Sequence, residues 1–290
     1  MLATSKEFLQ QVFRDFSRDE CPSMAAALAY ATLFSLPSLL LIVIFIAGLV
    51  LGPRAASGQI EAKLSGAMGP QAAAQIQSMV SNVAQNHTGG LIATLLGFTG
   101  LILSATSVLL QLQLCLNKAW KVRVIGSGIK GFAMKRVRSG LLLVGAGILA
   151  MVSVAASSVI SALARMLPFP GAAHVGEIVT SLAMFTILFA AILKVMPDVQ
   201  LRWSDVWTGG LFIAVLFVGG NFLIAIYLAH AGKASAYGAA GSLALILLWT
   251  YYSALIFLLG VELTQVWVRN QGREVLPKEG AIRLDQRSDI

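Results

Sequence analysis

Charged residues are scarce in this chain, and their scarcity argues against an ordinary soluble protein. Asp, Glu, Lys and Arg make up 12% of its 290 residues, whereas an average soluble domain carries about 25%. Histidine occurs three times and cysteine twice, which is too few for a histidine-rich metal cluster or a disulfide framework. A Gly-rich phosphate loop and a G-x-S-x-G elbow are also lacking. We therefore predict no enzyme, no metal site and no cofactor.

The few histidines and cysteines give no further chemical signal. The three histidines lie in connections between apolar runs that are predicted to be external to the membrane: His87, His174 and His230. Their spacing matches no ligand motif. Cys21 and Cys115 are both expected on the reducing side of the membrane, so a structural disulfide is not expected. The acidic residues are scattered along the chain, which leaves no cluster that would hold two metal ions for a nuclease.

Long apolar runs dominate what remains of the sequence, which is 57% hydrophobic. A helix needs about 20 apolar residues to cross the hydrocarbon of a bilayer. Six runs are near or above that length: Ala25–Leu51, Leu91–Asn117, Gly140–Ala164, Gly176–Met196, Val206–Ala229 and Ala239–Leu263. The sequence predicts an all-α, polytopic membrane helical bundle with six transmembrane helices, plus an amphipathic N-terminal helix and a helical external loop.

Other classes fit these runs poorly. A transmembrane barrel would alternate polar and apolar positions, whereas these runs are apolar on every face. A cleaved signal peptide is not expected, because the first 20 residues are charged throughout and the first apolar run exceeds the usual 7–15 residues. We expect the first span to stay in the mature protein.

The basic residues predict the orientation. Seventeen of the 21 Lys and Arg residues lie in the N-terminal segment, the second and fourth connections and the tail. Positive residues accumulate on the cytoplasmic side of membrane proteins, so both termini are predicted to be cytoplasmic. The same distribution accounts for the net charge of +8, and no nucleic-acid partner is expected.

The connections divide the chain into three predicted parts. Residues 1–22 form a cytoplasmic amphipathic helix, with apolar Phe8, Val12 and Phe16 at helical spacing, and Ser23 is the predicted N-cap of the first span. Residues 23–268 form the six-span domain, with a helical external loop over about 52–90 and a basic cytoplasmic loop over about 118–139. Residues 269–290 mix charges with few apolar residues and are predicted to be a disordered cytoplasmic tail.

The basic loop suggests contact with membrane lipids. It carries seven basic residues and no acid between Lys118 and Arg138. Such a loop is first a determinant of topology, and it also attracts anionic headgroups by about 1 kcal/mol per basic residue. The candidate lipid contacts are Lys121, Arg123, Lys130, Lys135, Arg136 and Arg138.

Polar side chains within the predicted spans are candidates for a substrate path. Polar groups in hydrocarbon usually face the interior of a bundle, where they serve either as a path or as packing between helices. The candidates are Ser104, Ser107, Gln111, Asn221, Tyr251, Tyr252 and Glu262. Glu262 is expected near the cytoplasmic interface as a partner for Lys or Arg, with a proton or cation site as the alternative.

Several stretches of the chain resemble the YihY/BrkB family of bacterial inner-membrane proteins. They are AAALAYATLFSLPSLLLI (residues 25–42), LNKAWKVR (116–123), MPDVQLRWSDVWTGGLFIAVLF (196–217) and AYGAAGSLALILLWTYYSALIFLLGVELTQVW (236–267). The resemblance implies six spans in a bacterial inner membrane, with both termini in the cytoplasm. It also implies a link to envelope lipid handling, and it carries over no ligand role for any single residue.

These observations lead to two hypotheses for function. The first is a transporter or translocator of a lipid or other amphiphile in envelope maintenance. The alternative is a non-transporting scaffold in envelope assembly, and ribonuclease activity is not expected because no catalytic group of residues supports it. The expected partners are membrane lipids with anionic headgroups, while a homo-oligomer and envelope-assembly proteins stay open.

Overall fold

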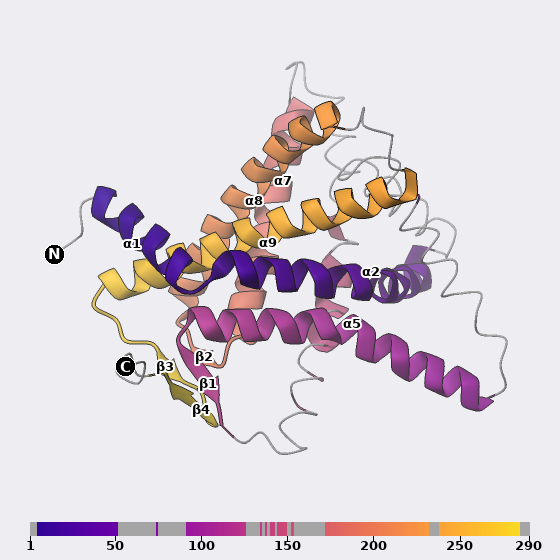
Figure 1. Cartoon of the computed structure of the whole chain (residues 1–290), viewed down its shortest axis with the longest axis horizontal. Helices are drawn as coiled ribbons and strands as arrows, with labels where there is room; N and C mark the ends of the chain where they lie inside the picture. Colours follow the sequence, from indigo (N-terminus) through magenta and orange to yellow (C-terminus); the bar gives the residue numbers. More distant parts are fainter. Residues whose placement is uncertain are drawn as a thin grey trace. The chain divides into compact units, whose positions relative to one another are not determined.

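The computed structural model describes most of the helical part of the chain. The described residues are 5–51, 91–125, 172–231 and 238–284, with 74, 134, 137, 140–142, 144–149, 152 and 153. The helices are α1 (Ser5–Arg18), α2 (Cys21–Leu51), α5 (Leu91–Ala119), α7 (Ala172–Val195), α8 (Trp203–Ala231) and α9 (Gly238–Asn270) (Figure 1). Most of the predicted external loop, basic loop and third span lie outside the described residues.

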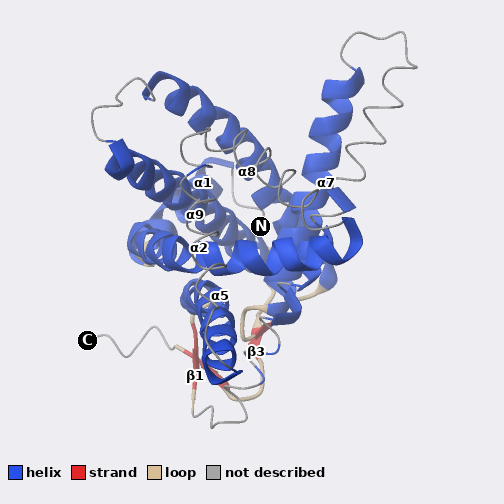
Figure 2. Cartoon of the chain, turned by 90° about the vertical axis from the view of Figure 1, so that its right-hand side faces the viewer, coloured by secondary structure: helices blue, strands red, loops and turns tan. Residues whose placement is uncertain are grey.

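Helix dominates the described chain, as predicted, and strand is confined to short segments (Figure 2). Three of the described helices are long and apolar enough to cross a membrane, over Val175–Val195, Trp203–Asn221 and Leu243–Asn270. They correspond to the last three predicted spans. The count of six spans stays a prediction.

Large apolar side chains on these helices face outward rather than into the protein. On α7, Val175 and Val179 are more than half exposed, and Trp203 and Val215 on α8 are exposed to a similar degree. A soluble protein rarely exposes so much apolar surface, whereas lipid tails solvate it. The packing thus agrees with the composition in indicating a membrane-embedded helical protein.

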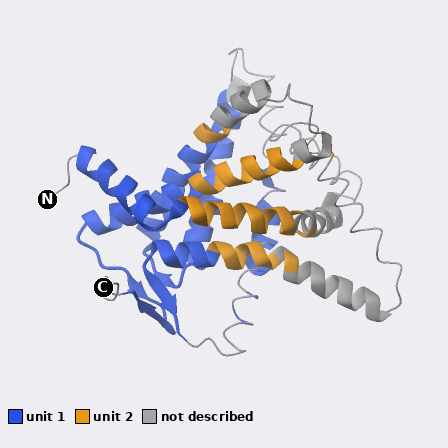
Figure 3. Cartoon of the chain, in the orientation of Figure 1, with its two compact units in different colours: residues 1–21, 113–218, 256–290 blue, residues 22–112, 219–255 orange. Residues whose placement is uncertain are grey.

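The chain divides into two compact units (Figure 3). The first comprises residues 1–21, 113–218 and 256–290, and it holds α1, α7, the strands and parts of α5, α8 and α9. The second comprises residues 22–112 and 219–255, which include most of α2 and the remaining parts of α5, α8 and α9. Each unit is described by itself below.

Glycines allow the helices of the first unit to approach closely. A Cβ added at Gly210 of α8 would lie 2.8 Å from the carbonyl oxygen of Thr186 and 2.9 Å from the amide nitrogen of Ala190, both in the backbone of α7. On α9, a Cβ added at Gly260 would lie 2.5 Å from the side chain of Ile213 of α8. These contacts leave no room for a larger residue at either glycine, in line with the small-residue packing of membrane helices.

Aromatic rings fill the space between the same three helices. Phe189 of α7 lies 5.4 Å from Phe217 of α8 and 5.6 Å from Phe257 of α9, measured between ring centroids. Tilted and edge-on arrangements at such distances are the favourable ones for aromatic pairs. The rings and the glycines together set the spacing of α7, α8 and α9 within this unit.

Two short antiparallel sheets correct the prediction of a disordered tail. Strand β4 (Ala281–Arg283) pairs with β1 (Val122–Val124), and β3 (Leu276–Pro277) pairs with β2 (Val199–Gln200). Residues 271–284 are therefore folded against the connections that follow α5 and α7, while 285–290 lie outside the described residues. The purely α-helical prediction missed these strands, because each has only two or three residues and its partner is distant in sequence.

Two predicted boundaries also differ from the structure. Helix α2 begins at Cys21, two residues before the predicted cap Ser23, and Pro22 lies in its first turn, where the missing amide hydrogen has no intrahelical partner to lose. At the other end of the chain, α9 continues to Asn270, beyond the predicted end of the span domain at residue 268.

Candidate functional site

Two helix ends of the first unit carry charged residues in an unusual backbone conformation. After α1, Glu20 has a φ of 55°, and after α5, Lys121 has a φ of 54°. This left-handed conformation commonly ends helices but favours glycine, because a side chain there costs about 1–2 kcal/mol. A charged residue at both positions indicates that its side chain has a use that glycine would not serve.

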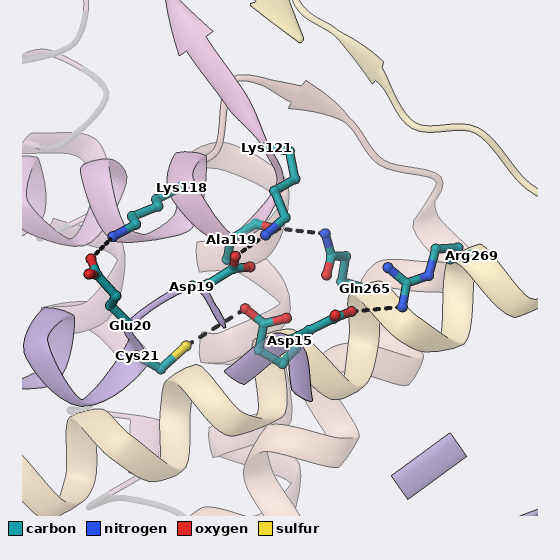
Figure 4. A network of polar contacts seen from close by, with 10 residues as sticks. Asp15, Asp19, Glu20, Cys21, Lys118, Ala119, Lys121, Gln265 and Arg269 are labelled. Carbon is teal, nitrogen blue, oxygen red and sulfur yellow. Dashed lines mark hydrogen bonds and ion pairs between the residues drawn. The ribbon is translucent and has the colours of Figure 1, made fainter. Parts of the chain in front are cut away.

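The charged side chains at these two ends pair with each other. Lys118 reaches Glu20 with its Nζ 2.6 Å from Oε2, and the ammonium of Lys121 donates to Oδ1 of Asp19 (Figure 4). The first pair is exposed, and the second is largely buried. The Lys118 hydrogen bond holds the pKa of the Glu20 carboxyl below its usual value. The contribution of this pair to stability is therefore present above the usual pKa and is lost as the pH falls through the lowered one.

Helix α9 supplies the third side of the same cluster. Arg269 donates to Oδ2 of Asp15 on α1 at 2.7 Å, and the amide of Gln265 donates to the carbonyl oxygen of Ala119 at the end of α5, also at 2.7 Å. These bonds connect α1, α5 and α9 within the first unit. We refer to Asp15, Asp19, Glu20, Cys21, Lys118, Lys121, Glu262, Gln265 and Arg269 as the α1–α5–α9 cluster.

Glu262 of α9 is a fully buried carboxylate of the cluster. Its side chain is 0% exposed, and the thiol of Cys21, which is also fully buried, lies 3.7 Å from its Oε1 atom. The sequence predicted an interfacial Lys or Arg partner for this carboxylate. In the structure, Lys121 instead pairs with Asp19, and the thiol of Cys21 lies beside Glu262.

A second buried carboxylate, Asp198, connects α5 to the turn before β2. Its Oδ2 atom accepts hydrogen bonds from Nε2 of Gln113 at 2.9 Å and from Nδ2 of Asn117 at 2.8 Å. The Asp198 amide donates in return to Oδ1 of Asn117 at 2.8 Å. All three residues are buried, so these bonds form in a medium of low dielectric constant, and this pattern indicates a structural clasp.

Bonds from Lys278 and Arg273 fix the folded tail within the same unit. The amide of Lys278 donates to the carbonyl oxygen of Asp198, and its ammonium donates to the carbonyl oxygen of Pro197 at 2.8 Å. Arg273 lies 2.6 Å from the buried carboxylate of Asp205, in the first turn of α8. The tail is thus part of the folded unit that holds the cluster.

The predicted path residues are divided between the two units. Glu262 belongs to the first unit, whereas Ser104, Ser107, Gln111, Asn221, Tyr251 and Tyr252 belong to the second. Two of the hydroxyls bond to the backbone: Ser104 donates to the carbonyl oxygen of Phe34 at 3.3 Å, and Ser107 donates to that of Ser104 at 2.7 Å. Backbone bonds of this kind favour the packing role for the two serines.

Of the candidate lipid contacts, two are described. Arg123 on β1 is exposed, which suits contact with a headgroup. Lys121 is only partly exposed and its ammonium is paired with Asp19, which makes it a member of the cluster instead. Lys130, Lys135, Arg136 and Arg138 lie outside the described residues.

Sequence reasoning missed Asp19, Cys21 and Gln265 as neighbours of Glu262. Gln265 follows Glu262 by three residues and so lies on the same helical face, which was a local signal available in the sequence. No local signal connects Asp19 to Lys121, because 102 positions separate them.

Comparison with known proteins places the chain in a family. A family model described as virulence factor BrkB matches residues 12–282. A UPF0761 membrane protein of Azotobacter vinelandii is 28% identical over 98% of this chain and 70% of its own length. A relative of the same description from Pseudomonas aeruginosa is 25% identical over 96% of this chain and 68% of its own length. A third UPF0761 membrane protein, from Psychromonas ingrahamii, is 25% identical over 89% of this chain and 86% of its own length.

These relatives share one description, membrane protein, and the resemblance noted from the sequence agrees with the matched family. No solved structure matches the chain. The family match covers nearly the whole chain, and the structure has three helices suited to crossing a bilayer. The chain is therefore an integral membrane protein of the BrkB family.

Proposed function

We propose that this protein is a transporter or translocator of a lipid or other amphiphile, acting without a covalent step. The single observation that carries the proposal is the fully buried carboxylate of Glu262, which lies on a helix suited to crossing the membrane. Ionisable residues in such helices are costly, and they commonly mark substrate or ion pathways.

The surroundings of Glu262 strengthen this inference. Helices α1, α2, α5 and α9 and the turns after α1 and α5 supply charged and polar side chains to the α1–α5–α9 cluster. Two of its residues adopt a backbone conformation that favours glycine. A purely structural core would be more stable with apolar residues of similar volume. The non-transporting scaffold would use exposed surfaces and has no need of this buried cluster.

The proposed substrate class follows from charge. Arg123 is exposed on β1, and the predicted basic loop continues the chain from there. Basic residues beside a membrane attract anionic headgroups. An anionic phospholipid presents such a headgroup together with the apolar tails that the exposed faces of the spanning helices accommodate.

Purified protein reconstituted into liposomes tests this function. We expect a fluorescently labelled anionic lipid to change leaflets faster in proteoliposomes than in protein-free liposomes of the same composition. Membrane protein of an unrelated family, reconstituted at the same density, controls for bilayer disturbance. Equal rates in all three preparations would contradict transport and would favour the scaffold.

The proposed orientation has both termini in the cytoplasm of a bacterium, with six spans in the inner membrane. A reporter that is active only in the cytoplasm should therefore be active when fused after Lys130 or at the tail, and silent near Gln75. The expectation rests on the concentration of Lys and Arg in the predicted cytoplasmic connections. An active reporter at Gln75 would reverse the orientation.

A further inference from the structure

The charges around Glu262 do not balance when every carboxyl group of the cluster is ionised. Three charged groups act on Glu262. They are Asp19 in the turn after α1, Lys121 in the turn after α5, and Asp15 on α1. Lys121 is paired with Asp19, and Arg269 of α9 is paired with Asp15. Glu262 is then left as one negative charge without a cation of its own among the described residues.

The remaining neighbours supply no positive charge. Cys21 at the start of α2 brings a thiol, and α8 meets this part of α9 through Gly209, whose added Cβ would lie 2.5 Å from the side chain of Thr264. The nearby Arg273 is committed to Asp205. An isolated ionised carboxylate in a buried position costs several kcal/mol, so a protein either pairs it or neutralises it.

Unsatisfied oxygen atoms point to the missing positive charge. Within the described residues, Oε2 of Glu262, Oδ2 of Asp19 and Oε1 of Gln265 are buried and have no hydrogen-bond donor. An ionised carboxylate can only accept hydrogen bonds, whereas a protonated one carries a donor. A proton on Oε2 of Glu262 turns that atom into a donor and also removes the excess negative charge.

We propose that Glu262 binds a proton on Oε2 and forms a proton-binding site at this end of α9. Asp19 keeps the Lys121 ammonium, so the proton supplies the positive charge that Glu262 otherwise lacks. The site follows from the charges and contacts alone. Its use as the coupling site of a transporter rests on the proposed function.

A metal cation fits the same position less well. The described residues contain no group of three or more His, Cys, Asp or Glu side chains that would hold a metal ion. In addition, the Lys121 ammonium already occupies the other oxygen of Asp19. A proton needs only the buried carboxyl group of Glu262, which the structure supplies.

Infrared spectroscopy of the purified protein tests the site directly, because a protonated carboxyl group has a carbonyl band distinct from that of a carboxylate. We expect such a band in the wild type at neutral pH, its loss at alkaline pH, and its absence in Glu262→Gln. The variant Glu274→Gln is the matched control, because Glu274 is an exposed carboxylate of the folded tail and its loss should leave the band unchanged.

A second variant tests whether the pairing of Lys121 with Asp19 is what leaves Glu262 protonated. In Asp19→Asn the Lys121 ammonium is released to neutralise Glu262, so the band should weaken although Glu262 is intact. A wild type without the band, or Glu262→Gln with the wild-type band, would overturn the proposal. So would a melting temperature that rises with sodium at constant ionic strength in the wild type alone. None of these readouts requires transport, so failure of the proton site and failure of the proposed function are distinguished.

Discussion

Replacing Asp198 by Ala should destabilise the protein more than any other single change considered for it. The substitution leaves the buried amides of Gln113 and Asn117 without their acceptor. At about 1–3 kcal/mol for each buried donor left unsatisfied, the expected loss is about 2–6 kcal/mol. The melting temperature and folded yield of the detergent-purified variant measure it.

The variant Asp198→Asn is the matched comparison. It keeps one carbonyl oxygen as an acceptor at nearly the same volume, so its loss of stability should be clearly smaller than that of Asp198→Ala. Two variants with equal and small losses would show that the bonds from α5 to this turn contribute little.

Replacing Gly210 by Ala should also cost about 1–3 kcal/mol, the usual range for adding a group to a filled core. The added Cβ would meet backbone atoms of Thr186 and Ala190 at 2.8 and 2.9 Å, and a backbone cannot yield as the end of a flexible side chain can. Helix α7 must therefore move away from α8. Thermal unfolding of the purified variant gives the loss.

Gly219 provides the control on the same helix. A Cβ added there meets nothing within 4 Å, so Gly219→Ala should melt at or above the wild-type temperature. Equal losses at Gly210 and Gly219 would mean that helix propensity, and not the contact with α7, determines the effect.

The sequence was sufficient to predict the helices, because apolar length and composition are local properties. The last three predicted spans correspond to helices long enough to cross a bilayer, within one turn or so at most ends. The motifs LNKAWKVR and MPDVQ were also recognised from the sequence. Their relation was not recognised, although Asn117 of the first bonds to Asp198 of the second.

The tail and the cluster could not be predicted, because their partners are far apart along the chain. Val122 pairs with Arg283 across two strands that no local sequence pattern predicts. Lys121 and Asp19 form an ion pair although 102 positions separate them in the sequence. In the tail, polar composition suggested disorder, whereas backbone pairing and the bonds of Lys278 fold it. Composition alone does not register such pairing.

Glu262 shows where local reasoning reached its limit. Its position near the end of an apolar run suggested an interfacial residue with a basic partner. In the structure α1, the turn after α5 and Cys21 enclose it, and the neighbouring lysine is committed to another carboxylate. Burial of this kind depends on which elements pack against α9, and that information is not local.

Lipid movement by wild-type and Glu262→Gln proteoliposomes tests the central claim most directly. Glutamine keeps the shape and neutral charge of the protonated side chain but cannot release a proton. We expect normal melting of the variant and a loss of at least about tenfold in the rate of anionic-lipid translocation, equivalent to about 1.4 kcal/mol in the barrier. Gly219→Ala should keep the wild-type rate. A Glu262→Gln variant that moves lipid as fast as the wild type would contradict a role for the buried cluster in transport.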